Sequence, residues 1–581
     1  MEILQSLFSN ISAGPSDYQK HMHRVYQKPM SAYTTKFFAD AVHLGTADVT
    51  AYRDYVMAKG PFINTPDLPK SNEKAANVRQ LGNELYQNRD YEGAIEKYNE
   101  SICWAENGSE ELGFGYANRS AVYYEQKEYH YALANIAMAK ANNYPARSMP
   151  KLLARETNCR KNIKNPEAPR SVPEVRITLN VEVNPKIPHL AKGIRMKEVS
   201  GYGRSLVTER SFKAGDVILH EQPTMAAISP ELKFMNCHYC SGANFQSLIP
   251  CPDCASVMYC NEQCMQKGRE AGHRYECGIT EKLQHISYGS NRIYLGPRMF
   301  FYGLSLYNHS LDEMMTYASE AGNSASTNPL LLDYTKLNPL EAFKVFHHFK
   351  LPTEKFMYEE SFRFYAAVYY SVYMKHPLVK SIVINQSKKD FMLRYILHYM
   401  RMIGFLTIGA YENFTNQVHL IASVCNHSCD PNTWAVYNNG QLKFIVILPI
   451  AKGDQILISY GPLYGTHSDF ERQQMVAGMH FECKCIVCDR SNNGQLKAWL
   501  ASTRKLQPIP RKSGSVLMRV LDNDDCHSAS KLNAVQQFVR RYAAHHPGEA
   551  FDKALTLYQQ MLTVTHMMEV RALLRANLRV V

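Results

Sequence analysis

The stretch "SVCNHSCDPNT", residues 423–433, places two cysteines, a histidine, two asparagines and an aspartate within eleven positions. Three interpretations fit this composition: a metal site, a cysteine/histidine nucleophile pair, or a packed strand that only resembles either. A nucleophilic cysteine needs a free thiolate beside a base, whereas a metal-bound thiolate cannot attack. The choice therefore depends on whether a cysteine group elsewhere in the chain lacks a ligand.

A second cysteine group, "FECKCIVC" at residues 481–488, supplies three ligands: Cys483, Cys485 and Cys488. A closed zinc site takes four ligands, so this group is one short. The candidates for the fourth ligand are Cys425, Cys429, His480 and Cys526. Two of these lie in the opening stretch, so that stretch becomes half of a metal site if either one is used.

A third group, "CHYCSGANFQSLIPCPDCASVMYCNEQCMQKGREAGHRYEC" at residues 237–277, contains four closely spaced ligand pairs. Spacings of two or three residues let one turn aim two ligands at the same ion, and four pairs suffice for two closed tetrahedral zinc sites. In a small module with little core, the ions would mainly hold the fold together. The eight ligands are Cys237, Cys240, Cys251, Cys254, Cys260, Cys264, His273 and Cys277.

The overall composition is that of a folded soluble protein with several domains. A chain of 581 residues suggests three or four domains at ~100–200 residues each, and 45% of the residues are hydrophobic. We expect a reducing compartment, the cytoplasm and nucleus, because the N-terminus has no signal-peptide pattern and no apolar stretch approaches ~18 residues. The formal charge of +12 is spread along the chain and is typical of a solvated surface, so we expect no direct nucleic-acid binding.

Residues 75–106 and 115–145 carry two copies of a helical pattern. In the first copy Gly82 and Ala94 are twelve residues apart, and in the second Ser120 and Ala132 keep that interval, 38 residues further on. The pattern resembles two tetratricopeptide units, in which small residues let paired helices approach closely. Generic helical hairpins are the alternative. A third helix around 148–163 would either complete a concave peptide-binding groove or only support the next domain.

These patterns predict an α+β multidomain protein. β-like segments follow residue 174, helical and aromatic ones fill 278–420, strands return in "TWAVYNNGQLKFIVIL" and "QILISYG", and helices end the chain. The predicted boundaries are an N-terminal helical and linker segment (1–72), tetratricopeptide-like repeats (73–165), a first β-rich part (174–235), a zinc finger (237–277), a helical insert (278–410), a second β-rich core (411–465), a zinc site (466–492) and a helical C-terminal region (493–581).

Four motifs in order resemble those of the SET domain of protein methyltransferases. They are "GYGRSLVTERSFKAGDVIL" at 201, "NHSCDPNT" at 426, "ISYG" at 458 and "FECKCIVC" at 481. The group at 237–277, inserted after the first motif, resembles the MYND zinc finger. The chain is thus similar to the SET and MYND domain-containing (SMYD) family, in its subgroup with N-terminal tetratricopeptide repeats. The resemblance covers residues 75–490.

This resemblance implies how the ligands pair. In a MYND finger the pairs interleave, so Cys237, Cys240, Cys260 and Cys264 would hold one zinc ion, and Cys251, Cys254, His273 and Cys277 another. In a SET domain the N-H-S-C strand threads beneath the segment that ends in the tyrosine. Its cysteine, Cys429, would then join Cys483, Cys485 and Cys488 on a third zinc ion, while Cys425 would be a packed apolar residue. The similar letters "YNHS" at 307–310 lack the following cysteine, and we interpret Asn308 and His309 as surface or turn residues.

The resemblance also implies S-adenosyl-L-methionine as cofactor, a lysine side chain of a protein as substrate, and methyl transfer to that lysine. Tyr460 would be the catalytic residue. The residues implied to bind the cofactor are Gly201, Tyr202, Gly203, Arg204, Asn426, His427, Tyr460 and Phe481. Two features depart from the family pattern. Met479 stands where many relatives have a second tyrosine, and "HYMRMIGFLTIGAY" lacks an asparagine that helps to anchor the cofactor.

Two other functions remain as alternatives. One is a catalytically weak or inactive adaptor that binds peptide partners through the finger and the tetratricopeptide groove. The other is a DNA-binding regulator, which the absence of recognition-helix spacing in the finger disfavours. We expect a monomer without membrane association.

Overall fold

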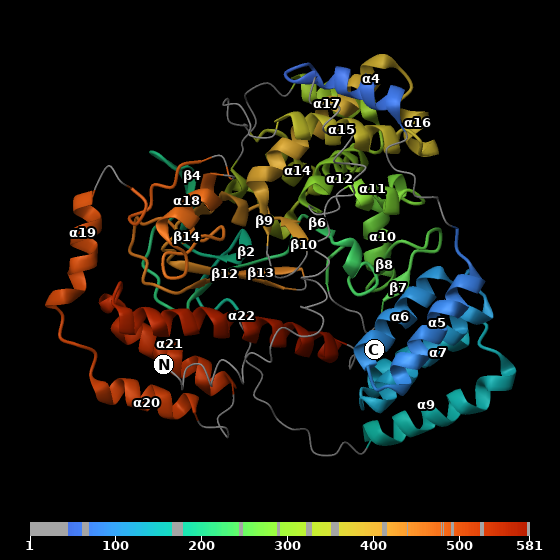
Figure 1. Cartoon of the computed structure of the whole chain (residues 1–581), viewed down its shortest axis with the longest axis horizontal. Coiled ribbons are helices and arrows are strands. Elements are labelled where there is room, and N and C mark those ends of the chain that lie inside the picture. Colours follow the sequence, from blue (N-terminus) through green and yellow to red (C-terminus); the bar gives the residue numbers. More distant parts are fainter. Residues whose placement is uncertain are drawn as a thin grey trace.

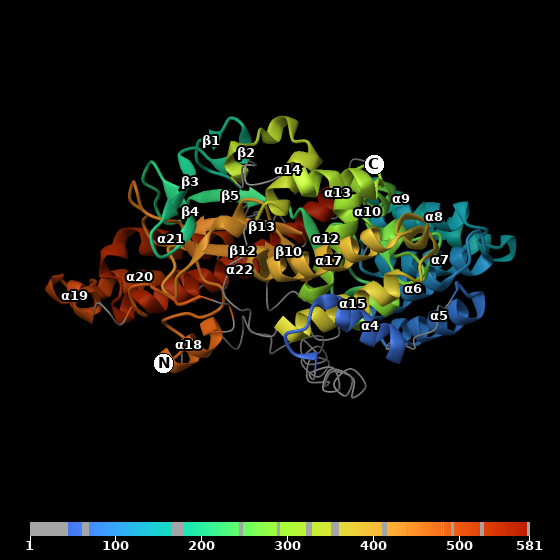
Figure 2. The same ribbon diagram turned by 90° about the horizontal axis from the view of Figure 1, so that it is seen from above.

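The computed structural model describes residues 44–60, 69–164, 178–242, 248–286, 291–320, 328–349, 359–409, 415–438, 440–477, 479, 481–489, 493–522 and 528–577. Helices α5–α9 lie at one end of the molecule and α19–α21 at the opposite end, with the β-sheets between them (Figures 1 and 2). Residues 166–173, between the predicted repeats and the first β-rich part, and the candidate ligands His480 and Cys526 lie outside the described residues.

The N-terminal part is helical, and α5, α6 and α7 begin at residues whose side chains satisfy free backbone N–H groups. The side chains of Ser71, Asp90 and Ser109 accept hydrogen bonds from the N–H groups of Lys74, Gly93 and Leu112. The elements are α4 (Val49–Lys59), α5 (Asn72–Gln87), α6 (Tyr91–Trp104), α7 (Glu110–Glu125), α8 (Tyr129–Ala141), η2 (Ala146–Ser148) and α9 (Met149–Lys164).

Helices α5 and α6 pair closely, as do α7 and α8. At Gly82 an added Cβ would lie 2.7 Å from the Tyr98 ring, so only glycine allows α5 to approach α6 this closely. This contact agrees with the prediction that small residues bring the paired helices together.

The central β-sheet has five strands in the order β1-β2-β5-β13-β12. Strands β5 and β13 run antiparallel, with Leu219 opposite Phe444, and both residues are buried in the core. The elements of this region are β1 (Val183–Asn184), β2 (Ile187–Ala191), β3 (Ile194–Val199), β4 (Gly203–Thr208), β5 (Val217–Glu221), β6 (Met225–Ile228), β9 (Thr407–Gly409), β10 (Thr415–Val418), η7 (Ala422–Val424), β11 (Asn426–His427), β12 (Thr433–Asn438), β13 (Gln441–Val446) and β14 (Leu457–Ile458).

One predicted strand is shorter than its pattern suggested. In the described part of "RITLNVEV", residues 178–183, only Val183 lies in a strand, as the first residue of β1. The reason is visible at Asn180, whose side chain accepts from Val217 N–H at 2.9 Å and donates to the Gly215 carbonyl at 2.9 Å. Its amide satisfies backbone groups that a neighbouring strand would otherwise pair with.

The cysteine-rich region packs against the N-terminal helices. One core contains Ile102 and Tyr116 of those helices together with Leu248 and Tyr259 of the cysteine-rich region. Its elements are η3 (Pro230–Leu232), β7 (Ile249–Pro250), β8 (Met258–Tyr259), α10 (Glu262–Glu270) and η4 (His273–Tyr275).

The largest core belongs to the helical insert, where many aromatic side chains are buried. Helix α4 packs on this insert rather than on α5–α9, and Arg394 binds Asp48 at 2.9 Å. Asn308 and His309 occupy the turn after α12 with positive φ values of 52° and 63°, as the turn interpretation predicts. The elements are α11 (Thr280–Ile286), α12 (Asn291–Leu306), α13 (Leu311–Glu320), η5 (Pro329–Leu331), η6 (Tyr334–Lys336), α14 (Pro339–His347), α15 (Glu359–Tyr373), α16 (Pro377–Ile382) and α17 (Gln386–Leu406).

The C-terminal region is helical as predicted, and it packs beneath the central sheet. Helix α22 contacts β12, where the Trp434 indole N–H donates to the Thr563 hydroxyl at 3.2 Å. The elements are α18 (Asp469–Ala477), α19 (Asn493–Ser502), η9 (Thr503–Lys505), α20 (Arg511–Leu521), α21 (Ser528–Tyr542), η10 (Ala543–His545) and α22 (Glu549–Asn577).

Candidate functional site

The opening stretch lies beside the segment that ends in Tyr460. Strands β11 and β14 pair in parallel, with Asn426 opposite Leu457 and His427 opposite Ile458. The Ser428 N–H extends this pairing to the Ile458 carbonyl at 2.9 Å. Two segments about thirty residues apart in the chain are therefore held side by side, and His427 adjoins Tyr460.

Cys429 comes together with the three downstream cysteines. Its Sγ lies 3.5 Å from that of Cys488 and 4.0 Å from that of Cys483, and Cys485 completes a group whose ligand atoms all lie within 4.8 Å of one another. Cys425 is absent from this group. It is buried in the central core, with its Sγ 3.1 Å from the Ile456 carbonyl, as expected of a packed residue.

His427 joins the cysteine group to Tyr460. Its Nδ1 accepts from the Tyr460 backbone N–H at 3.0 Å. Burial lowers the pKa of His427 to about 4, so the ring is neutral at pH 7 and carries one N–H. That N–H must sit on Nε2, which lies 3.2 Å from the Cys429 Sγ. His427 therefore donates to the thiolate, as ligand-supporting residues do at metal sites.

Two partly exposed aromatic rings lie next to His427, with their planes at 82° to each other. Tyr460 is 37% exposed and Phe481 is 36% exposed. The ring centroids of Tyr460 and Phe481 lie 5.3 Å and 5.8 Å from the His427 centroid. The Tyr460 hydroxyl donates to the Cys425 carbonyl at 2.6 Å. Desolvation raises the pKa of Tyr460 above its usual value, so the hydroxyl stays protonated.

The side chain of Asn426 binds strand β4. Its amide donates to the Arg204 carbonyl at 3.0 Å and to the Ser205 hydroxyl at 2.7 Å. Gly201, two residues before β4, and Gly203, its first residue, have φ values of +80° and +69° that favour glycine. At Gly201 the nearest side chain to an added Cβ is that of Lys484, at 3.4 Å, so this turn lies against the group formed by Cys429, Cys483, Cys485 and Cys488.

The side chains of Tyr202 and Arg204 diverge from this turn. Burial and the neighbouring thiolates of Cys485 and Cys483 raise the pKa of Tyr202 to about 12, which places it beside the cysteine group. The Arg204 guanidinium instead stacks over the Phe349 ring of the helical insert, 4.4 Å from its centroid. The predicted cofactor residues thus surround one region, but only part of the set directs side chains toward Tyr460.

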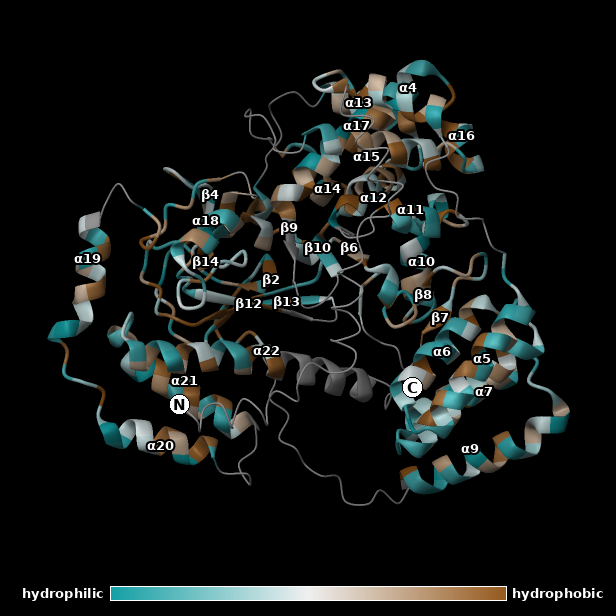
Figure 3. Ribbon diagram, viewed as in Figure 1, coloured by the Kyte–Doolittle hydropathy of each residue, from teal (hydrophilic) through white to brown (hydrophobic). Residues whose placement is uncertain are grey.

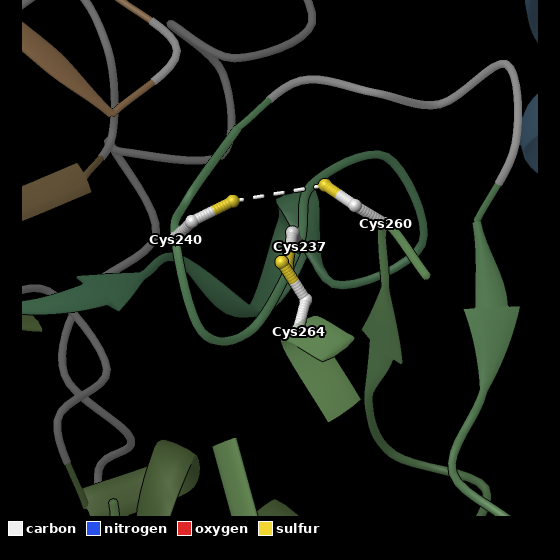
Figure 4. A group of neighbouring side chains, drawn as sticks. All are labelled: Cys237, Cys240, Cys260 and Cys264. Carbon is white, nitrogen blue, oxygen red and sulfur yellow. Dashed lines mark hydrogen bonds between the residues drawn. The ribbon is translucent and has the colours of Figure 1, made fainter. Parts of the chain in front are cut away.

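The cysteine-rich region holds two further groups. Figure 4 shows Cys237, Cys240, Cys260 and Cys264 pointing toward one another, with 3.6 Å between the sulfur atoms of Cys240 and Cys260. The second group lies deeper in the region and has 3.7 Å between Cys254 Sγ and His273 Nε2. Its members are Cys251, Cys254, His273 and Cys277. The structure therefore brings together the same interleaved sets that the family resemblance implies.

A buried ion-pair network centred on Glu276 adjoins the group of Cys251, Cys254, His273 and Cys277. Glu276 contacts Arg298 of α12 at 3.3 Å and His238 at 3.4 Å, and the Tyr373 hydroxyl of α15 donates to it at 3.2 Å. Burial opposes ionisation of Glu276, but Arg298 and His238 lower its pKa to about 2. His238, His273 and Glu276 also lie close enough to hold a metal. Because Arg298 already neutralises Glu276, we interpret this trio as the junction between the finger and the insert.

Two residues near the site were not predicted. Glu221, at the end of β5, accepts the N–H groups of Leu420, Ile421 and Ala422, each at 2.9 Å. It fixes the turn that leads into the opening stretch. No local pattern distinguishes it from other strand-end glutamates, because its partners lie two hundred residues away.

The second is His546, which binds the aspartate that follows Cys429. Its Nε2 lies 2.9 Å from both Asp430 carboxylate oxygens, and its Nδ1 lies 2.7 Å from Asp552. Burial disfavours the charged ring, but the two carboxylates raise the pKa of His546 to about 9. An imidazolium therefore ties the C-terminal region to the opening stretch.

The residues present fit both metal and cofactor. None of the described cysteines is in a disulfide, and groups of three or four thiols this close are stable as thiolates only beside a cation. His273 Nδ1 has no partner in the described part of the chain, so only its Nε2 engages the group. The exposed rings of Tyr460 and Phe481 offer a face on which a planar base can stack. Met479, half-buried, follows α18 and donates its N–H to the Val476 carbonyl at 2.8 Å.

Comparison with known proteins gives one family and several relatives. The SET domain family model matches residues 203–461. "Protein-lysine N-methyltransferase SMYD4" of Danio rerio is 29% identical over 237 residues, an alignment that covers 38% of this chain and 31% of that protein. Its counterpart in Mus musculus is 21% identical over 595 residues, covering 81% of this chain and 73% of that protein. A SET and MYND domain-containing protein of Dictyostelium discoideum is 25% identical, covering 52% and 83%.

Within the described residues, no helix has the length and apolar character to cross a membrane.

Proposed function

We propose that this chain belongs to the SET and MYND domain-containing (SMYD) family and is an S-adenosylmethionine-dependent protein-lysine N-methyltransferase. The observation that carries the proposal is the parallel pairing of β11 with β14, which sets the exposed Tyr460 ring against His427. When bound, S-adenosylmethionine supplies a methyl group on a sulfonium. The protein must then hold a neutral lysine amine in line with it, so most of the acceleration comes from orientation and desolvation.

Tyr460 has the chemistry to orient that amine. Its hydroxyl proton is committed to the Cys425 carbonyl, while the oxygen lone pairs can still accept an amine N–H. A raised pKa keeps the hydroxyl neutral, so it adds no negative charge that would favour the ammonium form of the lysine. Phe481 and His427 would exclude water beside it. The backbone turn at Gly201–Gly203 and the Asn426–His427 strand would hold the cofactor.

We further propose three zinc ions per chain, one for each closed group of four ligands. Two would hold the finger together and the third would fix Cys429, and through it His427. The helix pairs α5/α6 and α7/α8 would be two tetratricopeptide units with α9 as a capping helix, and they offer a surface for peptide partners. The comparisons do not favour the inactive adaptor. The cytoplasm and nucleus remain the predicted compartments.

The test is transfer of labelled methyl groups by the zinc-loaded full-length chain to proteins of a cell lysate. We expect labelled lysines with the native chain and a loss of at least about tenfold in Tyr460→Phe, which removes one oriented hydroxyl. Tyr144→Phe is the matched control, because this half-buried tyrosine lies in the N-terminal helices. Labelling that survives Tyr460→Phe unchanged, or that never appears, would exclude the proposed reaction.

A further inference from the structure

The positive charge of the chain, expected to be spread evenly, is concentrated in one segment. Residues 490–521 contain seven lysines and arginines and no aspartate or glutamate, so this segment carries +7 of the formal charge of +12. It follows the cysteine group at 483–488 and is ended by Asp522. Its basic residues are Arg490, Lys497, Arg504, Lys505, Arg511, Lys512 and Arg519.

Six of these cations lie on α19, η9 and α20, at the end of the molecule opposite α5–α9 (Figures 1 and 2). Each of the six side chains is exposed, and none forms an ion pair within the described part of the chain. A solvated surface usually mixes charges of both signs. A run of exposed cations without acidic neighbours in the sequence instead produces a field of one sign, which attracts an anionic partner.

The inner faces of both helices are already packed against the protein. Leu517 and Leu521 of α20 are buried in a core that also contains residues of α21 and α22. On α19 the centroid of the Trp499 ring lies 5.4 Å from that of His546. Figure 3 shows hydrophobic as well as hydrophilic colours along α20. The packed apolar residues fix the orientation of the helices, so the cations are held on the outer faces.

Three aliphatic side chains are exposed among these cations. Leu500, Leu506 and Val516 are 37%, 38% and 49% exposed. On α20, Val516 lies one turn from both Lys512 and Arg519. Cations and aliphatic groups on one exposed surface suit a bilayer, where charged headgroups lie directly above acyl chains.

Nucleic acid is the other extended polyanion that such a surface could meet. Proteins hold its single strands by stacking aromatic side chains on the bases. Trp499 is the only aromatic residue of 490–521, and its ring already contacts Tyr464 and His546. Exposed aliphatic side chains gain nothing from a phosphate backbone. The side chains between the cations therefore favour a lipid surface.

We propose that the basic outer surface of α19, η9 and α20 binds membranes that contain anionic phospholipids. The lysines and arginines would lie among the headgroups, while Leu500, Leu506 and Val516 would reach the boundary with the acyl chains. This association is peripheral and needs no membrane-spanning helix, but it revises the expectation of no membrane association. It goes beyond the proposed methyl transfer and agrees with the predicted cytoplasmic compartment, because the cytoplasmic leaflet is negatively charged.

The test is sedimentation of the zinc-loaded full-length protein with vesicles of phosphatidylcholine, either alone or with about 30% phosphatidylserine. We expect binding to the anionic vesicles only. The double change Arg511→Gln with Lys512→Gln should weaken this binding at least about tenfold, because each cation near the surface adds to the attraction. Val516→Ser should weaken it at least about threefold, because less aliphatic surface enters the bilayer.

The matched control is Lys151→Gln with Lys161→Gln, which removes the same charge from exposed positions of α9, at the opposite end of the molecule. It should leave vesicle binding within about twofold of the native value, because charges so far from the bilayer are screened. Thermal melting of each variant reports whether the helices remain folded.

Absence of binding, equal binding to the two kinds of vesicle, or equal losses in the two double variants would overturn the inference. Vesicle binding that Val516→Ser leaves unchanged would overturn it too, and binding of a random-sequence DNA duplex would then assign the surface to nucleic acid. Methyl transfer to soluble proteins should not change in any of these variants. A failure of this inference is therefore distinguishable from a failure of the proposed function.

Discussion

His427 acts through both of its ring nitrogens. One nitrogen accepts the backbone N–H of Tyr460, and the other donates to the thiolate of Cys429. A change in the position of Cys429 would therefore be passed to Tyr460 through one rigid ring. At the scale of single residues, this is the link between the candidate third metal site and the candidate catalytic tyrosine.

The two cysteines of the opening stretch should behave differently when replaced by serine. We expect Cys429→Ser to lower the metal content from three zinc ions to two and to destabilise the protein by several kcal/mol, because a closed site loses one of its ligands. Cys425→Ser should cost only ~1–3 kcal/mol, since it buries a hydroxyl. The Ile456 carbonyl, 3.1 Å from this position, can accept from the new hydroxyl and favours the low end.

Metal analysis of each purified variant, combined with urea unfolding, measures both effects. A native zinc content of two, or equal destabilisation by the two substitutions, would contradict the assignment of Cys429 to a zinc site with Cys483, Cys485 and Cys488.

His546 predicts a pH dependence with a definite sign. Its pKa rises from an ordinary 6.5 to about 9 in the folded protein, so the folded state binds the extra proton between these values. The stabilisation it provides should be fully present below about pH 6.5 and should disappear as the pH rises through about 9. The difference in melting temperature between the native protein and His546→Gln should therefore shrink from pH 6.5 to 9.5. A difference that stays constant or grows with pH would contradict the charged state of this histidine.

At the scale of elements, the cysteine-rich finger is fixed to the helical region by polar groups as well as by a shared apolar core. Arg119 of α7 is fully buried and donates to Asn135 of α8 at 2.6 Å, to Asn99 of α6 at 2.5 Å and to the Leu248 carbonyl at 2.9 Å, next to β7. Within the described residues no carboxylate pairs with this arginine. One side chain thus connects α7 to α6, to α8 and to the residue that precedes β7.

Replacing Arg119 should loosen this junction. Arg119→Met keeps much of the volume but removes the guanidinium hydrogen bonds to the oxygens of Asn99, Asn135 and Leu248, which should cost ~3 kcal/mol. We expect faster amide hydrogen exchange in α6, α7 and β7, while the central sheet keeps its protection. Arg89→Met, at an exposed turn position, is the control. Exchange that is unchanged in both variants would show that the apolar core alone holds the finger.

The elements also show what could be predicted from the sequence. The helix pairs, the C-terminal helices and the return of strands after residue 433 follow local patterns, and the structure has them. Asn180 shows the limit, because its side chain replaces the strand pairing that the alternation of "RITLNVEV" predicted. The docking of α4 on the insert was not predicted either, since the pair of Asp48 and Arg394 spans more than three hundred residues.

At the scale of the whole molecule, the comparisons support the resemblance that four ordered motifs had indicated, since the SET domain model matches residues 203–461. The spacing of cysteines, together with this resemblance, was sufficient to name the groups of ligands that the structure brings together. Glu221 and His546 could not be found in this way, because neither belongs to a motif and both act on the opening stretch from distant parts of the chain.

The molecule therefore has its candidate catalytic tyrosine at the meeting point of several parts. Glu221 of the central sheet binds the backbone of residues 420–422. Cys483 and Cys488 lie against Cys429, and His546 of the C-terminal region binds Asp430. Met479 and the absence of an asparagine from α17 are the two departures from the family pattern. The account requires that the remaining residues still bind the cofactor.

Calorimetric titration of S-adenosylmethionine into the full-length protein, loaded with three zinc ions, tests this requirement most directly. The account predicts saturable binding of one cofactor molecule per chain, weakened in Cys429→Ser because His427 loses its thiolate partner. No saturable binding to the folded, zinc-loaded protein would contradict the assignment of this chain as a methyltransferase.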